Sequence, residues 1–181
     1  MKRTWTVLTA LLLVMVMLVS FPVEASAATK NNHDGSKFTI GEKSFVKQYQ
    51  KHLKDNGLNY TFYLEKNLSD SNFRHYILKD SQGSYTMSLS LYLKGATKKL
   101  ETIRLNFDPR YCTEDQQASN TNAMLLAYEV ANQYMNDVDW DRLFSDGNMY
   151  STHDGYGISG TLYGVYFQMT LGSEDVQLLI E

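Results

Sequence analysis

The alternation of apolar and polar residues between Ser84 and Phe107 limits what this chain can fold into more than any other feature of its sequence. One set of alternate positions is apolar or aromatic, namely Tyr85, Met87, Leu89, Leu91 and Leu93. The set between them holds Thr86, Ser88, Ser90, Tyr92 and Lys94. A period of two is that of a β-strand with one buried and one solvated face. The alternation resumes at 102–107 after a Gly-containing turn at 95–99, which predicts an antiparallel hairpin.

Further strands are predicted on both sides of this hairpin. The period-two pattern covers 59–65 and, less regularly, 73–79 before it, and 163–171 and 176–180 after it. Short polar turns separate consecutive strands, so the first four form a meander. The stretch at 149–160 is rich in Gly and Tyr, and we expect a loop or an irregular strand there.

Two helices complete the pattern. Apolar residues at helical spacing predict an amphipathic helix that begins near Thr39 and Glu42, in capping-box form, and ends at Asn56-Gly57. Its apolar stripe is Phe45, Val46, Tyr49 and Leu53, and its solvated side carries Lys47, Lys51 and Lys54.

Between Ala123 and Met135 nearly every residue is apolar or small, so the second helix is largely buried and should cross the sheet. It could open at Thr113–Gln116 or be capped later, at Ser119 or Asn120. The predicted fold class is α+β: an antiparallel meander sheet packed against one amphipathic and one largely buried helix. The order of a helix followed by strands occurs twice, which raises the possibility of two halves, in one sheet or in two.

The N-terminus has the features of a secretory signal peptide. Lys2 and Arg3 precede a short apolar run from Val7 to Val19, and Ala25-Ser26-Ala27 follows it. We expect a signal peptide at 1–27, a flexible polar leader at 28–37 and a single domain at 38–181. The protein would then be secreted and extracellular, with no membrane span left after cleavage.

Charge and cysteine content exclude some classes of partner. The chain has 17 Lys and Arg, 20 Asp and Glu and a net charge of −3. Removal of the signal peptide takes two cations and one anion and leaves about −4. Mild acidity argues against nucleic acid and anionic lipid as partners. Cys112 is the only cysteine, so no internal disulfide can form.

One stretch suggests a metal. Asp137, Asp139 and Asp141 have the spacing of the first three ligands of a calcium loop, so a calcium-stabilised surface protein is one alternative. The sixth position of such a loop should be Gly and is Arg142, and the twelfth should be Glu and is Asn148. An acidic solvated turn is the simpler interpretation, and we expect no metal.

Another stretch suggests acid–base chemistry. His153 and Asp154 could act as acid and base in a small secreted hydrolase, or Asp154-Gly155 could simply form a turn. Zinc-ligand spacing, a phosphate loop and a dinucleotide fingerprint are all missing from the sequence, so no cofactor is expected. No catalytic residue is assigned.

The remaining candidate is a surface for recognition. If the faces of the hairpin are assigned correctly, short hydroxyl side chains, tyrosines and one arginine share the face away from the core. The candidate binding residues are Tyr63, Ser88, Ser90, Tyr92, Thr102 and Arg104. Tyrosine and arginine are typical of recognition surfaces. We therefore expect an exported non-enzymatic module that binds a protein or a polysaccharide of the cell envelope or medium. The alternative is an idle solvated face.

A second group of tyrosines, Tyr150, Tyr156, Tyr163 and Tyr166, could frame a groove or pack at the edge of the core.

Overall fold

The computed structural model of the chain describes residues 32–34, 36–132 and 137–181. The expected signal peptide and the first residues of the expected leader lie outside these ranges, as do residues 133–136. Among the described helices, none has the length and apolar character needed to cross a bilayer.

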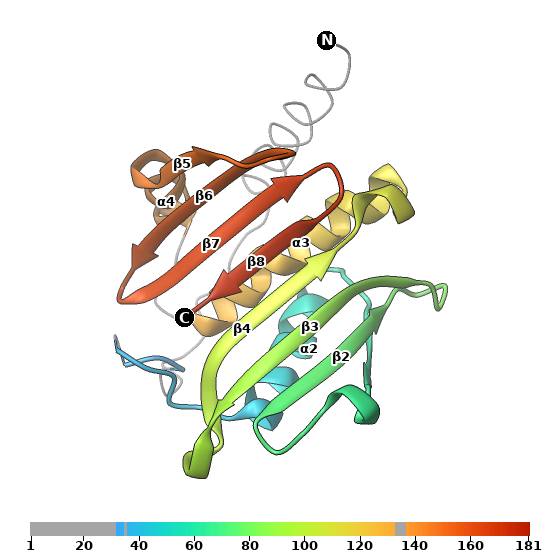
Figure 1. Cartoon of the computed structure of the whole chain (residues 1–181), viewed down its shortest axis with the longest axis vertical. Coiled ribbons are helices and arrows are strands. Elements are labelled where there is room, and N and C mark those ends of the chain that lie inside the picture. Colours follow the sequence, from blue (N-terminus) through green and yellow to red (C-terminus); the bar gives the residue numbers. More distant parts are fainter. Residues whose placement is uncertain (1–31, 35, 133–136) are drawn as a thin grey trace. The chain divides into compact units, whose positions relative to one another are not determined.

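Eight strands form one antiparallel sheet in the order β1-β2-β3-β4-β8-β7-β6-β5 (Figure 1). They are β1 (Thr61–Leu64), β2 (Phe73–Lys79), β3 (Tyr85–Lys94), β4 (Lys99–Phe107), β5 (Asn148–Ser151), β6 (Gly155–Leu162), β7 (Val165–Gly172) and β8 (Val176–Ile180). Each half of the chain is a four-strand meander, and the last strands of the two halves, β4 and β8, pair with each other. The α+β class is confirmed, and the two halves share one sheet.

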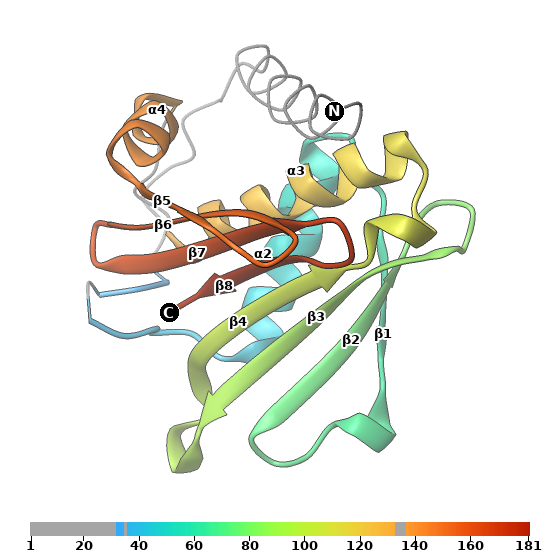
Figure 2. The same cartoon turned by 45° about the horizontal axis from the view of Figure 1, so that its top comes forward.

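The helices lie on one face of this sheet, as the view in Figure 2 shows. They are α2 (Glu42–Asp55), α3 (Glu114–Ala131) and α4 (Asp137–Asp146). Of the short 3-10 turns, η1 (Lys66–Leu68) joins β1 to β2, η2 (Gly95–Thr97) joins β3 to β4, and η3 (Pro109–Tyr111) joins β4 to α3. Helix α3 runs across the sheet, as its apolar circumference predicts, and every residue from Ala123 to Ala131 except Glu129 is buried.

The core fills the space between the helices and the sheet. The inward side chains of β3, β4, β8 and β7 make a continuous row across the sheet, Leu89, Leu105, Leu178 and Met169, and all four are buried. Two buried tyrosines fix the helices by hydrogen bonds to backbone carbonyls. Tyr49 of α2 donates to Ala123 O at 2.8 Å, and Tyr128 of α3 donates to Val165 O at 2.9 Å. Burying each Leu or Met side chain of the row stabilises the fold by about 2 kcal/mol.

Helix α2 ends as predicted, but it does not begin as predicted. Its N-cap is Gly41 and no side chain caps it, so the expected capping box at Thr39 is wrong. Backbone contacts decide the start: the Thr39 amide donates to Asn32 O, and a Cβ on Gly41 would lie 2.9 Å from Lys98 O. At the other end, Gly57 has φ +76°, which favours glycine.

The start of helix α3 is settled between the alternatives that the sequence leaves open. Thr113 is the N-cap and forms a full capping box with Gln116, whose amide donates to Thr113 Oγ1 at 3.3 Å. Asn120 is therefore inside the helix rather than at its end, and its side chain is fully buried.

Two described residues of the expected leader belong to the packed structure. Asn32 is fully buried, and its Nδ2 donates to Val130 O at 2.8 Å. His33 pairs with Phe38 in an isolated β-bridge, and the two rings meet edge to face with centroids 5.0 Å apart. Asn32 and His33 are thus part of the packed structure, whereas Asp34, Ser36 and Lys37 are exposed.

The Gly- and Tyr-rich stretch, for which the sequence predicts a loop or an irregular strand, forms two strands, β5 and β6, that pair without a bulge. Its glycines are required by close contacts within the sheet: a Cβ on Gly155 would lie 1.9 Å from Leu171 O. The expected strand at 163–171 begins two residues later, because Tyr163 and Gly164 form the β6–β7 turn with φ +51° and +82°. Such a two-residue turn with both φ values positive matches the twist of an antiparallel pair.

Candidate functional site: the open face of the sheet

The face of the sheet opposite the helices, here called the open face, is the candidate site. On β1 to β4 its alternate side chains are Thr61, Tyr63, Phe73, His75, Ile77, Lys79, Tyr85, Ser88, Ser90, Tyr92, Lys94, Lys99, Thr102, Arg104 and Asn106. On β5 to β8 they are Tyr150, Gly157, Ser159, Tyr166, Gln168, Thr170, Gln177 and Leu179. All six binding residues that the sequence suggests belong to this face.

The serine side chains of the open face are less exposed to solvent than the sequence suggests. Ser88 is 3% exposed and Ser90 is 7% exposed, so these two candidates lie below the surface. Ser88 donates to Asn106 on β4, and Ser90 Oγ lies 3.0 Å from His75 Nδ1 on β2. Larger neighbours cover these short side chains, and the prediction that they form a solvated stripe is wrong.

A β-bulge explains part of this burial. The register between β2 and β3 shifts after the Leu78–Met87 pair, so that Lys79 pairs with Tyr85 and Thr86 is the extra residue. Tyr85, which the simple alternation assigns to the core, is thereby 54% exposed. Burial raises the pKa of Tyr85, and the nearby Ser88 hydroxyl offsets this only in part.

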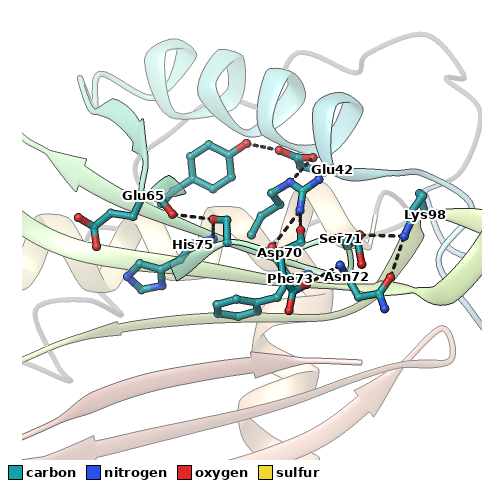
Figure 3. A network of polar contacts seen from close by, with 11 residues as sticks. Glu42, Glu65, Asp70, Ser71, Asn72, Phe73, His75 and Lys98 are labelled. Atoms are coloured by element: carbon teal, nitrogen blue, oxygen red, sulfur yellow. Dashed lines mark hydrogen bonds and ion pairs between the residues drawn. The ribbon is translucent and has the colours of Figure 1, made fainter. Parts of the chain in front are cut away.

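The surface above the buried serines is formed by aromatic rings and Arg104. The rings of Phe73 and Tyr92 are 4.9 Å apart, and the guanidinium carbon of Arg104 lies 5.9 Å from the centre of the Tyr92 ring. Phe73 and His75 stack at 6.2 Å, and in Figure 3 both rings lie on the side of the sheet away from Glu42. Tyr92 and Thr102 are half-buried, whereas Arg104 is exposed.

The second half of the open face is organised around Tyr150. Gln168 Nε2 donates to the Tyr150 hydroxyl at 2.7 Å, and Thr170 Oγ1 lies 3.3 Å from the same oxygen. The ring lies on Gly157, where a Cβ would come within 2.2 Å of it. Tyr150 is therefore held in one position by two strands.

The four tyrosines of the predicted second group do not gather in one groove. Tyr150 and Tyr166 are half-buried on the open face, and Tyr156 is exposed and faces the other side of the sheet. Tyr163 lies in the β6–β7 turn and donates to Asp139 on α4 at 3.0 Å.

A polar network at the start of β2, drawn in Figure 3, is the most connected cluster on the helix side. Glu42 of α2 accepts a hydrogen bond from Tyr76 and forms an ion pair with Arg74 at 3.3 Å. Burial raises the pKa of Tyr76, and the hydrogen bond to Glu42 raises it further. Lys98 donates to Ser71 O at 2.8 Å and to Asn72 Oδ1 at 2.7 Å.

This network borders a surface depression of about 450 Å³ lined by residues that include Gly41, Glu42 and Lys98. Arg74 and Lys98, the cations of the network, are already paired or hydrogen-bonded to the protein, which suits a structural clamp between α2 and β2.

The three aspartates suggested for calcium do not form a loop. They lie in helix α4, where Asp139 is buried and Asp141 is exposed. Asp139 accepts the hydrogen bond from Tyr163 and thus ties α4 to the β6–β7 turn. Within the part of the chain that the structure describes, no group of three or more His, Cys, Asp or Glu residues is placed to hold a metal ion.

The suggested acid–base pair lies in the β5–β6 turn. His153 is exposed, and the side chain of Asp154 accepts from Glu174 N at 3.4 Å and from Thr152 Oγ1 at 3.5 Å. Asp154 therefore joins two adjacent turns, in agreement with the turn interpretation of Asp154-Gly155.

Sequence patterns missed a buried polar cluster beside the bulge. Asn120 accepts from the Tyr60 hydroxyl at 2.9 Å and donates to Thr86 O at 2.9 Å. The Cys112 thiol lies 3.6 Å from Asn120 Nδ2, and burial raises its pKa. A raised pKa leaves a thiol protonated and unreactive near neutral pH, so Cys112 is a packing residue here. Thr113 at the cap was the available signal, since it places Asn120 inside α3.

Comparison of the chain with protein-family models, with curated proteins and with solved structures finds no match. Its function is therefore inferred from its own residues.

Proposed function

We propose that this protein is an exported, non-enzymatic binding module that recognises a protein or another component of the cell envelope or medium through its open face. The observation that supports this most directly is the pair formed by Tyr92 and Arg104 in the middle of a broad sheet face. Tyrosine and arginine dominate the energetics of many recognition surfaces because both offer large contact areas and directed hydrogen bonds.

The position of the helices supports the proposal as well. The helices and the apolar core take up the other face, so the open face can meet a partner without rearrangement of the fold. Its aromatic side chains are positioned in advance by neighbours, as Tyr150 is by Gln168 and Gly157. Side chains that are already ordered lose less entropy on binding.

The test uses protein purified from cells that express the full chain, immobilised as bait for surface and medium extracts of the source cells. A Tyr92→Ala/Arg104→Ala double variant is compared with a Tyr156→Ala/Arg142→Ala control. The control changes the same residue types: Tyr156 faces the other side of the sheet, and Arg142 lies on helix α4. All baits are first checked for a native melting temperature.

A ligand retained by the natural protein and the control but lost from the Tyr92/Arg104 variant is the expected result. A ligand retained equally by all three baits would contradict the assignment of the open face.

A further inference from the structure

Arg104 differs from every other arginine that the structure describes. Arg74 forms an ion pair with Glu42, Arg110 with Asp108 and Glu174, and Arg142 with Asp146. The guanidinium of Arg104 forms no ion pair with a described carboxylate, and its contact is the face of the Tyr92 ring. Arg104 is also exposed and lies at the centre of the sheet, on β4 between Ser90 of β3 and Leu179 of β8.

The charge around Arg104 is unusual for an acidic protein. Within the strands, the pairing places four formally charged side chains on the open face, Lys79, Lys94, Lys99 and Arg104, and all four are positive. Glu101 is exposed at the bulge of β4, beside Thr102. The Lys79 Nζ lies 4.9 Å from the centre of the Tyr63 ring, so this cation already has an aromatic partner. One carboxylate, Glu181, follows β8 on this face, and no ion pair joins it to Arg104. The net charge of the whole chain is −3, so its excess acid lies mainly elsewhere.

Guanidinium groups recognise a particular chemistry. Arginine presents five N–H donors in a rigid planar fork that fits a carboxylate with two parallel hydrogen bonds. The Tyr92 ring supports one face of the fork, while the neutral side chains of Asn106 and Gln177 lie on the next row of the same face. A carboxylate that reaches Arg104 would therefore meet a guanidinium that no described carboxylate engages in an ion pair, although Glu101 and Glu181 lie close by in the sequence of β4 and after β8.

The sheet surface around Arg104 favours a macromolecular partner with a broad contact. Two depressions, of about 300 and 450 Å³, are lined by residues of helix α2 and its surroundings, and neither includes Tyr92 or Arg104. Small ligands are usually enclosed by concave sites, whereas protein interfaces are broad, with aromatic residues and arginine near the centre.

From these observations we propose that the partner is a protein that places an aspartate or glutamate side chain on Arg104, beside the ring of Tyr92. This inference rests on the proposed function and specifies the chemistry of the partner. Binding then requires the positive charge and the fork of Arg104, in addition to the aromatic surface around it.

The probe for this proposal is a library of random peptides displayed on phage, selected on the immobilised natural protein. Peptides that also bind a Tyr92→Ala/Arg104→Ala variant are removed, so the remaining pool depends on the open face. The expected result is a pool in which Asp or Glu recurs at one position. For a selected synthetic peptide, Arg104→Gln should weaken binding about 10-fold or more, and Arg104→Glu further. Arg142→Gln serves as the matched control and should leave the affinity unchanged.

The decisive comparison replaces the recurrent acid of that peptide by its amide. Its affinity should fall for the natural protein and change little for the Arg104→Gln variant, because the two groups act on each other. Peptides that need Tyr92 but have no recurrent acid, or that bind the Arg104→Gln variant equally well, would overturn this inference and leave the proposed function standing. A selection that leaves no peptides dependent on the open face would count against both.

Discussion

Replacing Asn120 by alanine tests how the fold holds the bulge that shapes the open face. Asn120 is fully buried and joins three segments: it accepts from Tyr60 ahead of β1, donates to the bulge carbonyl of Thr86 on β3, and lies on α3. Its removal leaves the Tyr60 hydroxyl without its acceptor, and it leaves the Thr86 carbonyl with only a weak donor, the Cys112 thiol, whose Sγ lies 3.8 Å away. The Thr86 carbonyl is buried beneath α3 and cannot be rescued by water, whereas the Tyr60 hydroxyl is only partly buried.

The magnitude follows from these two environments. An unsatisfied buried polar group costs about 1–3 kcal/mol, so we assign about 2 kcal/mol to Thr86 O and about 1 kcal/mol to the Tyr60 hydroxyl. Asn120→Ala should therefore reduce the free energy of unfolding by about 3 kcal/mol, and the melting temperature of a chain of this size by about 10 °C.

The assay is urea unfolding followed by circular dichroism, with Asn67→Ala as the control because Asn67 is exposed in η1. Tyr60→Phe removes the hydroxyl from the other side of the same bond, so the two changes should couple by about 1 kcal/mol in a double-mutant cycle. A loss below about 1 kcal/mol for Asn120→Ala, or strict additivity with Tyr60→Phe, would refute the reasoning.

Two further predictions concern buried tyrosines and a glycine. Burial raises the pKa of Tyr128 to about 12, and it raises the pKa of Tyr49, Tyr60 and Tyr76 as well. Unfolded tyrosine begins to ionise at about pH 10, so the contribution of these residues to stability is full below that pH. It is lost as the pH rises toward the pKa values of the folded state. Urea unfolding at pH 8, 10 and 11 should show a falling free energy of unfolding, and a constant value would contradict this. Gly157→Ala places a Cβ within 2.2 Å of the Tyr150 ring and should expel that ring from the open face. Ring-proton shifts of Tyr150 report the displacement, and an unmoved ring would show that the strands can absorb the extra atom.

The elements with an uninterrupted period were predictable from the sequence. β2 and β8 match their predicted ranges, and α2 buries the stripe of Phe45, Tyr49 and Leu53 that its spacing indicates. These predictions succeed because burial on one face of an element leaves a period in the sequence. The two-half arrangement was visible in the order of elements, although the pairing of β4 with β8 that unites the halves leaves no local trace.

The failures have identifiable physical causes. β5 and β6 escaped prediction because Gly155, Gly157 and Gly160 replace side chains where backbone or rings come close, which removes the apolar period. The exposure of Ser88 and Ser90 was misjudged because small hydroxyl residues suit buried and solvated sheet faces equally well.

The candidate site was predictable only in part. The six suggested residues do share one face, because successive side chains of a strand point to opposite faces of the sheet. The isolation of Arg104 from carboxylates depends on strands and helices distant in sequence, and no local pattern could reveal it.

The central claim, that the open face is the binding surface, is tested most directly by hydroxyl-radical footprinting of the protein with and without its captured ligand. The proposal predicts that oxidation of Tyr92 falls on binding and that Tyr63 or Tyr150, at the two ends of the face, follows it. Tyr156, on the other side of the sheet, and Tyr111, which is 83% exposed in η3, should be oxidised as before. Protection of Tyr156 with unchanged oxidation of Tyr92 would contradict the claim and move the binding surface to the helix-covered side.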